Sequence, residues 1–372
     1  MNDFKLHAQR HHAQLSEAMA RVLDSGWYVL GTEVQSFERE FAAYLGVPHA
    51  VGVGNGMDAL QLALMAWDIG PGHEVITTPN SAFASTLAIL RVGATPVFVD
   101  IDERSYAVDP ALVSQAITSQ TRAILPVHIH GRAADLTALS ALAERHQLLL
   151  LNDACQAHGA RHAQRDIASY GQASAYSFYP TKNLGCLGDG GMVVCHDAEQ
   201  AARMRGLRDY GQARRYHHVE LGLNSRLDEL QAAILRAKLA YLPQDTERRR
   251  AIAQRYLQHL EGLPLVLPEW DAQAVWHLFV VRTSRRDALA DCLREREVQS
   301  LVHYPVLIPE QPALPRCRFP GSGREAVPYR RGALPVAERC ANEYLSLPIN
   351  PELSDAQVDT VCAAVRAFFE PA

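Results

Sequence analysis

The sequence of 372 residues contains no long apolar run and no long run of basic residues. No segment approaches the ~20 apolar residues that cross a bilayer, and residues 1–7 lack the apolar core of a signal peptide. The net charge is −5, with 36 Lys and Arg against 41 Asp and Glu. We therefore expect a soluble, cytoplasmic protein that has neither a nucleic acid nor a membrane as its partner.

Cysteine pairs and metal-binding motifs are also missing. The 7 cysteines are scattered without a Cys-x-x-Cys pair, and their number is odd, which favours free thiols in a reducing compartment. The 16 histidines form no His-Glu-x-x-His motif and no Cys/His spacing of the zinc type, so no metal site is expected. The cysteines are residues 155, 186, 195, 292, 317, 340 and 362.

The chain does contain enough apolar sequence for a large core. The hydrophobic fraction is 48%, and a chain of this length is expected to form two domains or one domain with a smaller appendage. We expect the boundary within Glu247 to Pro268. The prediction is a large domain over residues 1–250, which includes N-terminal helices, and a small α+β domain over residues 251–372.

Short apolar segments alternate with segments of helical periodicity along the first half of the chain. Repeated β-α-β units imply a mostly parallel sheet with helices on both faces. Thr32-x-x-Gln35 is predicted to be a capping box for a helix that ends at Gly46, and Pro243 is predicted to break a long helical stretch between Leu221 and Leu260. The other expected strands are 50–53, 75–78, 96–100, 122–128, a run ending at 153, 173–178, 191–196, 276–282 and 298–303, and the other expected helices are 82–92, one from 110, 135–146, 197–209, 287–296 and 355–369.

Two segments place chemically active side chains directly after strands. Asp153 follows the apolar run Leu148 to Leu151, so we expect its carboxylate at the carboxyl end of a buried strand, where α/β proteins place their ligands. Lys182 follows the strand-like segment 173–178 and lies in a glycine-rich loop. Pyridoxal phosphate requires such a pair, because the amine forms a Schiff base and the carboxylate keeps the pyridine nitrogen protonated. Taken alone, such a lysine is usually a solvated charge and such an aspartate a turn or helix cap.

A third segment suits a phosphate group. The predicted strand 50–53 runs into a Gly-Asn-Gly turn at residues 54–56, and a helix follows, so backbone N–H groups at the helix start would face an anion. A dinucleotide site is the competing interpretation, but Met57 stands where Gly-x-Gly-x-x-Gly needs its third glycine. A plain connection between strand and helix explains the same turn.

The strings Asp-Ala-Cys-Gln-Ala-His-Gly at residues 153–159 and Ser-Phe-Tyr-Pro-Thr-Lys-Asn-Leu-Gly at residues 177–185 resemble the paired signatures of the nucleotide-sugar aminotransferases. These enzymes are the DegT/DnrJ/StrS-type branch of the aspartate aminotransferase superfamily. The similarity begins near residues 25–28 and continues past residues 224–229. It implies an α/β protein of PLP fold type I, with a smaller C-terminal α+β domain and with pyridoxal 5'-phosphate as cofactor.

The resemblance also implies roles for individual residues. Lys182 would hold the cofactor as a Schiff base and move a proton between the amino donor and the cofactor, and Asp153 would pair with the pyridine nitrogen. Met57 lacks the hydroxyl that the family commonly has at this position, so only backbone N–H groups are expected to bind the phosphate there. Asn224 would come from the second subunit of a homodimer; alternatively, it is a helix N-cap. The full set of implied cofactor contacts is Gly56, Met57, Phe83, Asp153, Gln156, Ser177, Lys182 and Asn224.

Further residues are candidates for contacts to the substrates, and each has a simpler structural interpretation. His158 is otherwise a satisfied structural histidine, Arg226 a surface or helix charge, and Phe83 an ordinary core aromatic. Pro309 stands where some family members carry a histidine, so that contact is not carried over. The substrate candidates are His158, Tyr179, His303, Tyr304 and Arg226, and the donor carboxylate could also meet Arg316, Arg318, Arg330 or Arg331 in the proline-rich segment 305–335, which we expect to be an ordered loop.

The implied activity is transfer of an amino group from L-glutamate to a keto group of a nucleotide-linked deoxysugar. The string at residues 183–191 resembles the 3-aminotransferases, whereas enzymes that aminate carbon 4 commonly carry a Thr-rich string that ends in Gly-Glu-Gly-Gly. We therefore expect a dTDP-linked 3-keto-6-deoxyhexose as substrate and a dTDP-3-amino-3,6-dideoxyhexose as product. The alternatives are a 4-keto sugar aminotransferase, a non-catalytic relative that binds the cofactor or sugar as a regulator, and a dehydratase on the same scaffold; Lys182 argues against the last two.

Overall fold

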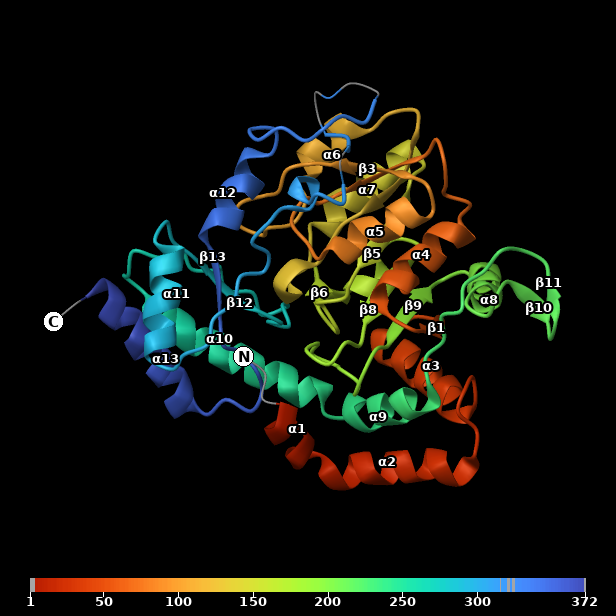
Figure 1. The fold of residues 1–372 in the computed structure, drawn as a ribbon, viewed down its shortest axis with the longest axis horizontal. Helices are drawn as coiled ribbons and strands as arrows, with labels where there is room; N and C mark the ends of the chain where they lie inside the picture. Colours follow the sequence, from red (N-terminus) through yellow and green to blue (C-terminus); the bar gives the residue numbers. More distant parts are fainter. Residues whose placement is uncertain (1–3, 315, 320–321, 323–324, 371–372) are drawn as a thin grey trace.

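A seven-stranded sheet forms the centre of the structure, a computed structural model that describes residues 4–314, 316–319, 322 and 325–370 (Figure 1). The strand order is β1-β9-β8-β5-β4-β2-β3, and β9 runs antiparallel to both of its neighbours. The pairs β2–β3, β2–β4, β4–β5 and β5–β8 are parallel, which confirms the predicted mostly parallel sheet. The strands are β1 (His49–Val53), β2 (Glu74–Thr77), β3 (Thr95–Phe98), β4 (Thr121–Leu125), β5 (Leu149–Asp153), β8 (Ala173–Ser177) and β9 (Gly191–Cys195).

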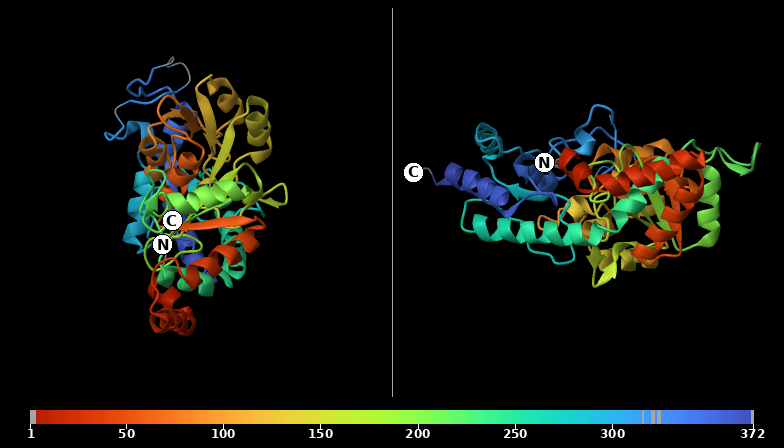
Figure 2. Two further views of the ribbon diagram at one scale, coloured as in Figure 1. Left: turned by 90° about the vertical axis from the view of Figure 1, so that its right-hand side faces the viewer. Right: turned by 90° about the horizontal axis from the view of Figure 1, so that it is seen from below.

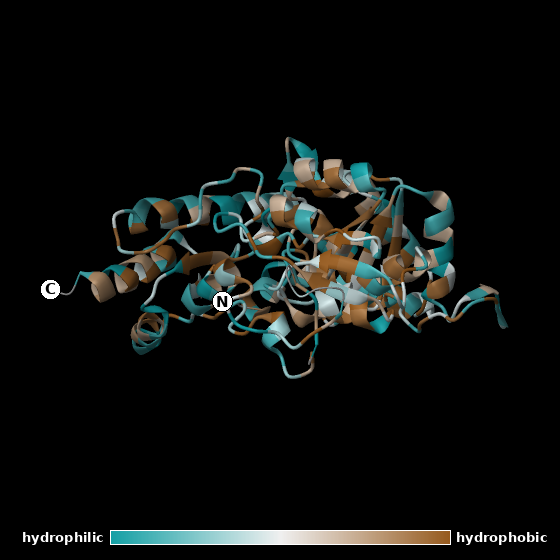
Figure 3. Ribbon diagram, turned by 90° about the horizontal axis from the view of Figure 1, so that it is seen from above, coloured by the Kyte–Doolittle hydropathy of each residue, from teal (hydrophilic) through white to brown (hydrophobic). Residues whose placement is uncertain are grey.

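Helices cover both faces of this sheet, as predicted (Figure 2). Because successive strand residues point to opposite faces, Leu150 and Tyr176 belong to one apolar cluster while Leu151 and Ala175 belong to another. Apolar residues accordingly concentrate in the central strands (Figure 3). The first cluster includes residues of α3 (Thr32–Leu45), α6 (Pro110–Ala116), α7 (Leu136–His146) and α9 (Glu229–Leu239), and the second includes residues of α4 (Gly56–Ala66), α5 (Phe83–Arg91) and α8 (Ala198–Leu207).

The start of α3 differs from the prediction. Thr32 is the first helical residue, and its neighbour Gly31 occupies the N-cap position without a side-chain hydrogen bond, so the predicted capping box is wrong. The carboxylate of Glu229 caps the helix instead, because it accepts hydrogen bonds from the N–H groups of Gly31 at 2.8 Å and of Val34 at 2.9 Å. A side chain from α9 thus satisfies the free donors of this helix end.

The long helical stretch predicted after Leu221 consists of α9 and α10 (Leu242–Leu260). The first of these helices begins at Glu229, with Asp228 as its N-cap, so Asn224 is not a helix cap. Pro243 lies in the first turn of α10, where a missing N–H group breaks no helical hydrogen bond. The predicted break at this proline is therefore confirmed.

The C-terminal part has its own apolar cluster. Helices α10, α11 (Arg286–Glu295) and α13 (Asp355–Phe369) pack around an antiparallel pair formed by β12 (Phe279–Arg282) and β13 (Tyr344–Leu347). The strand expected over residues 298–303 is wrong, because Leu301 forms only an isolated bridge, to Ser346. On the basis of the separate cluster, we propose residues 251–372 as the smaller domain, with the boundary inside α10.

The remaining elements lie around these two parts. The N-terminal helix α2 (His12–Ser25) lies along α9, and α1 (Phe4–Arg10) precedes it (Figure 1). In the proline-rich segment, the carbonyl of Arg318 accepts a hydrogen bond from the N–H of Phe98 in β3 at 2.8 Å, as expected of an ordered loop. Residues 315, 320–321 and 323–324 of this segment lie outside the described residues. None of the described helices has the length and apolar content needed to cross a membrane. The other elements are α12 (Pro335–Glu343), the pairs β6 (Arg161–His162) with β7 (Arg165–Asp166) and β10 (Gln212–Arg214) with β11 (His217–His218), and the short 3-10 helices Ile129–Gly131, Ile167–Ser169 and Ile308–Glu310.

Candidate active site

A cavity of about 390 Å³ lies where β5 and β8 end and α4 begins. The cavity brings together Asp153 and Lys182, which are almost thirty positions apart in the sequence. Asp153 ends β5, and Lys182 lies in the loop that follows the neighbouring parallel strand β8. This is the end of the sheet at which open α/β proteins bind ligands. The cavity is lined by Asn55, Gly56, Met57, Leu60, Ser81, Ala82, Ala84, Ser85, Val127, Asp153, Cys155, Gln156, Ser177, Tyr179, Lys182 and Asp189.

Asp153 is the last residue of β5 and is only 4% exposed. The hydroxyl of Ser85 in α5 donates a hydrogen bond to its Oδ2 atom at 2.7 Å, and the N–H of Cys155 donates to Oδ1 at 3.1 Å. A buried carboxylate needs such donors to remain charged, and each oxygen keeps further acceptor capacity. The side chain is thus oriented at the cavity wall and still able to accept a hydrogen bond from a ligand.

Lys182 lies in the loop that joins β8 to β9. The N–H of Phe178 donates to the carbonyl of Gly190 at 2.8 Å, which closes the base of the loop, and the N–H of Lys182 donates to the carbonyl of Tyr179 at 2.9 Å. Burial lowers the pKa of the Lys182 amine, while Cys155 and the carboxylate of Asp153 act in the opposite direction. A lowered pKa raises the neutral, nucleophilic fraction of an amine, which Schiff-base chemistry requires.

The turn before α4 can hold a phosphate. Asn55 caps the helix, because its side-chain oxygen accepts the N–H of Asp58 at 2.8 Å. The N–H groups of Gly56 and Met57, in the same first turn, have no acceptor within the described part of the chain, and they lie at the positive end of the helix. An added Cβ at Gly56 would lie 2.7 Å from the Cβ of Ser177, so only glycine fits this contact. Backbone donors, the Ser177 hydroxyl, the Lys182 amine and the Asp153 carboxylate together match the groups that pyridoxal phosphate requires.

His158 and Phe83 are among the predicted residues that do not line the cavity. His158 is 0% exposed, its ring lies against Tyr176 and Phe178, and its Nε2 atom lies 2.9 Å from the carbonyl oxygen of Ser177. The turn after β5 directs this ring into the core beneath Ser177, so the contact of His158 with the sugar stays a prediction. Phe83 is half-buried against the apolar cluster and is not one of the residues that line the cavity, so its stacking on the cofactor stays a prediction.

The other predicted substrate residues occupy different places. Tyr179 is 53% exposed and lines the cavity. Arg226 lies apart from it and pairs with Asp209 at 2.8 Å, and Asn224 is exposed on the same segment. His303 bonds through Nδ1 to the Ser346 hydroxyl at 2.9 Å. Tyr304 reaches the cavity indirectly: its hydroxyl accepts a hydrogen bond from Gln156 at 3.2 Å.

The arginines of the proline-rich segment are engaged elsewhere. Arg318 is buried against Glu74, Arg331 pairs with Glu310 at 2.7 Å, and Arg316 donates to the carbonyl of Ala326. None of the arginines that the structure describes lines the cavity. Pro309 is buried in a 3-10 helix. Binding of the donor carboxylate by one of these arginines stays a prediction.

Sequence reasoning missed several lining residues. Asn55 could have been recognised, because asparagine before a helix is a preferred N-cap. Ser85, Cys155 and Asp189 had no comparable signal: the contact of Ser85 with Asp153 joins residues 68 positions apart, and the other two lie in the signature strings without an implied role.

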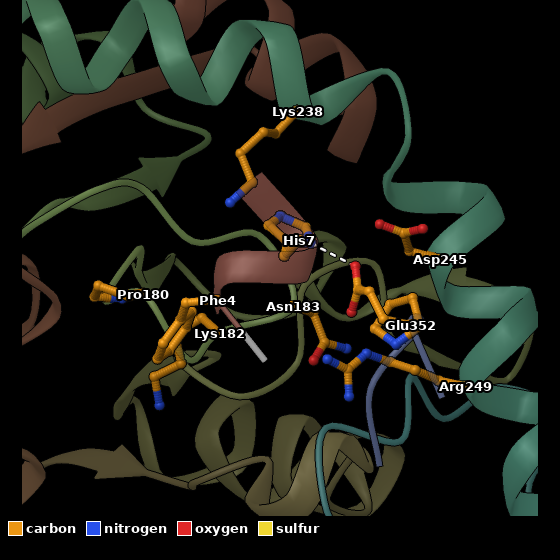
Figure 4. A pocket seen from close by; sticks show the side chains of 10 residues that line it. Phe4, His7, Pro180, Lys182, Asn183, Lys238, Asp245, Arg249 and Glu352 are labelled. Carbon is orange, nitrogen blue, oxygen red and sulfur yellow. Dashed lines mark hydrogen bonds and ion pairs between the residues drawn. The ribbon is translucent and has the colours of Figure 1, made fainter. Parts of the chain in front are cut away.

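A smaller pocket of about 30 Å³ lies on the other side of the Lys182 loop, beneath α1 (Figure 4). His7 and Glu352 face each other across it, 2.6 Å apart, and Arg249 donates to the carbonyl of Ile349 at 3.1 Å. This pocket is much smaller than the cavity of about 390 Å³ that contains Asp153.

The open α/β sheet, the loop lysine opposite a strand-end aspartate and the phosphate turn define an enzyme of the pyridoxal-phosphate class. The chain belongs to the DegT/DnrJ/EryC1/StrS aminotransferase family, whose model matches residues 9–366. The cofactor is pyridoxal 5'-phosphate, and the chain is a nucleotide-sugar aminotransferase. Both predictions from the two signature strings are thereby confirmed.

Three known proteins illustrate the relationship. A dTDP-3-amino-3,4,6-trideoxy-alpha-D-glucose transaminase from Streptomyces venezuelae is 50% identical over 371 residues, which cover 99% of this chain and 95% of the relative. A dTDP-3-amino-3,6-dideoxy-alpha-D-galactopyranose transaminase from Aneurinibacillus thermoaerophilus is 43% identical, covering 96% of each chain. The crystal structure of S. venezuelae DesV in complex with a ketimine intermediate is 49% identical with a TM-score of 0.94, and covers 100% of this chain and 98% of DesV.

Proposed function

We propose that the enzyme transfers the amino group of L-glutamate to the 3-keto carbon of a dTDP-linked 6-deoxyhexose and forms a dTDP-3-amino-3,6-dideoxyhexose. The observation that carries this proposal is the chemistry of the two relatives, whose names both place nitrogen on carbon 3 of a dTDP-linked deoxysugar. The loop at residues 183–191 supports it, because this loop borders the cavity through Asp189 and can restrict which keto carbon reaches the amino group.

The residues of the cavity suit this reaction. Bound there, the cofactor supplies an aldehyde carbon that carries the amino group and a ring that stabilises negative charge at the donor's α-carbon. The Asp153 carboxylate would pair with the protonated pyridine nitrogen, and the hydrogen bonds from Ser85 and from the N–H of Cys155 hold this carboxylate at the cavity wall. The Lys182 amine, with its lowered pKa, would accept the proton of the donor's α-carbon and pass it to the cofactor carbon that bears the transferred nitrogen.

Binding of the cofactor falls to the start of α4 and to β8. The N–H groups of Gly56 and Met57 and the hydroxyl of Ser177 are the proposed phosphate ligands, and Gln156 is the proposed contact to the ring. Tyr179, exposed at the cavity, is the proposed contact to the sugar. His303 lies outside the set of lining residues, so any contact that it makes to substrate depends on movement of the C-terminal segment.

We also propose a cytoplasmic homodimer with composite sites, in which Asn224 reaches the phosphate bound by the partner subunit. In support, Asn224 is exposed and is not one of the residues that line the cavity of its own subunit. Mixing inactive Lys182→Ala subunits with inactive Asn224→Ala subunits is expected to restore part of the activity, because one hybrid site is intact. Full activity of an isolated monomer would contradict this arrangement.

The experiment that tests the reaction offers the 3-keto and the 4-keto isomers of the dTDP sugar separately, with L-glutamate as donor. The 3-keto isomer should be aminated far faster, and NMR should place nitrogen on carbon 3. Lys182→Ala serves as the control for non-enzymatic amination. Nitrogen mainly on carbon 4 would refute the positional proposal and favour the 4-keto alternative. A failure of glutamate to change the visible absorbance of the bound cofactor would refute glutamate as donor.

A further inference from the structure

The side-chain amide of Gln156 is held on two sides by segments far apart in sequence. Its Oε1 atom accepts a hydrogen bond from the N–H of His130 at 2.7 Å, and its Nε2 atom donates to the hydroxyl of Tyr304 at 3.2 Å. His130 belongs to the 3-10 helix after β4, and Tyr304 belongs to the C-terminal part of the chain. Gln156 is 5% exposed and lines the cavity beside Asp153.

The two contacts fix the orientation of the amide. If the amide were turned by 180°, its NH₂ group would face the N–H of His130, and two donors cannot bond to each other. The observed orientation is therefore the one that satisfies both ends. One hydrogen of Nε2 is used by Tyr304, and the second remains for an acceptor in the cavity.

Tyr304 is suited to this contact in its protonated form. Its ring is half-buried and packs against the apolar cluster of the large sheet. Burial and, to a smaller extent, the nearby carboxylate of Asp153 raise the pKa of Tyr304 to about 12, although the hydrogen bond from Gln156 acts in the opposite direction. The hydroxyl thus stays neutral near pH 7 and adds no second negative charge beside Asp153.

We propose that Tyr304 is a positioning residue for the cofactor that acts through Gln156, rather than a residue that binds the substrate. Its hydroxyl holds the Gln156 amide in the orientation that presents an N–H group to the cavity. Tyr304 thereby connects the C-terminal part of the chain to the cofactor-binding wall of the large sheet. This inference rests on the proposed contact between Gln156 and the cofactor.

The substitution Tyr304→Phe isolates the hydroxyl, because it keeps the packed ring. Loss of one neutral hydrogen bond to Gln156 is expected to weaken cofactor binding about two- to tenfold. Tyr344→Phe is a matched control: its hydroxyl also accepts from a side-chain amide, that of Asn80, at 3.1 Å, but Asn80 does not line the cavity. Tyr344→Phe should leave the cofactor's dissociation constant unchanged.

A double-mutant cycle with Gln156→Ala tests the route of the effect. The dissociation constant of pyridoxal phosphate is measured by titrating the cofactor-depleted full chain, for each single variant and for the double variant. Gln156→Ala should weaken binding, and Tyr304→Phe should add nothing to it, because the two residues act through one contact. The KM for the keto-sugar should likewise not respond to Tyr304→Phe once Gln156 is gone.

Four results would overturn the inference. Wild-type cofactor affinity in Tyr304→Phe would show that the hydroxyl does not position the amide. Full additivity in the double variant would show that Tyr304 acts independently of Gln156, and a KM for the sugar that rises in both backgrounds would return Tyr304 to the substrate. Unchanged affinity in Gln156→Ala would show that Gln156 does not contact the cofactor, and Tyr304 could then not act through it. The proposed reaction is judged separately, by the product formed from the two keto isomers.

Discussion

The substitution Gly56→Ala tests the phosphate turn with the smallest change that the chain allows. The added Cβ would lie 2.7 Å from the Sγ atom of Cys155 and 2.7 Å from the Cβ of Ser177. Neither atom can easily move away, because Ser177 ends β8 and Cys155 directly follows β5. Alanine is otherwise favoured over glycine in a helix, so any loss must come from this steric contact.

The expected magnitude follows from overpacking. Forcing an extra methyl into a packed contact costs about 1–3 kcal/mol, and the strain is relieved if the start of α4 moves away from Ser177. Such a movement displaces the N–H groups of Gly56 and Met57 from the phosphate, so cofactor binding should weaken by about 5- to 150-fold. The assay is titration of the cofactor-depleted chain, combined with thermal unfolding without cofactor to report any loss of stability.

Gly54→Ala provides the control in the same turn. Its added Cβ would lie 3.3 Å from the Oγ atom of Ser225, a milder contact than the 2.7 Å at Gly56, so affinity should change less. Cofactor affinity of Gly56→Ala within about twofold of the wild type would refute the reasoning, because an overpacked turn cannot keep its ligand geometry. Lowered stability with unchanged affinity would show that the turn packs against Ser177 but does not hold the phosphate.

Three further outcomes are expected. Lys182→Ala should bind the cofactor only noncovalently and lose transamination, so borohydride reduction should no longer fix the cofactor to the protein; fixation in this variant would assign the Schiff base to another lysine. Asp153→Asn should lower kcat about 10²- to 10³-fold or more, since unpairing a buried charge costs about 3–5 kcal/mol, and activity within a few fold of wild type would remove Asp153 from the mechanism. Burial, with the charge of Lys182, lowers the pKa of His158 to about 3, so near pH 6.5 the unfolded chain takes up a proton that the folded chain does not, and stability should fall as pH falls from about 6.5 towards 3. His158→Gln should reduce this loss of stability in denaturant titrations. An unchanged loss in the variant would show that the His158 ring accepts a proton in the folded state.

Local patterns in the sequence were sufficient to predict the large sheet. The apolar run before Asp153 and the helical periodicity of residues 135–146 need no distant partner to be recognised, and both elements are present, as β5 and α7. The two signature strings predicted that an amine and a carboxylate share a site, and the structure places both at one cavity.

Contacts between distant segments could not be predicted in this way. The cap of α3 comes from Glu229, 195 positions beyond Val34, so the local Thr32-x-x-Gln35 pattern pointed to the wrong acceptor. His158 illustrates a second limit: it follows a strand end by a few residues, and the direction of its ring depends on the backbone turn rather than on the residue type. Residues 298–303 have the composition of a strand but meet a partner only at Leu301.

The antiparallel strand β9 explains why the lysine lies where it does. A parallel neighbour of β8 would need a crossover through a helix, which would carry the chain away from the ligand-binding end of the sheet. Because β9 returns beside β8 in the opposite direction, the loop between them stays at the end where β5 and β8 finish. The hydrogen bond from Phe178 to Gly190 closes this loop, and Lys182 is therefore held opposite Asp153 by the sheet itself. Helix α4 begins at the same end of the sheet, because β1 runs parallel to β8. The lysine amine, the aspartate carboxylate and the phosphate-binding turn that the cofactor needs therefore meet at one edge of the sheet.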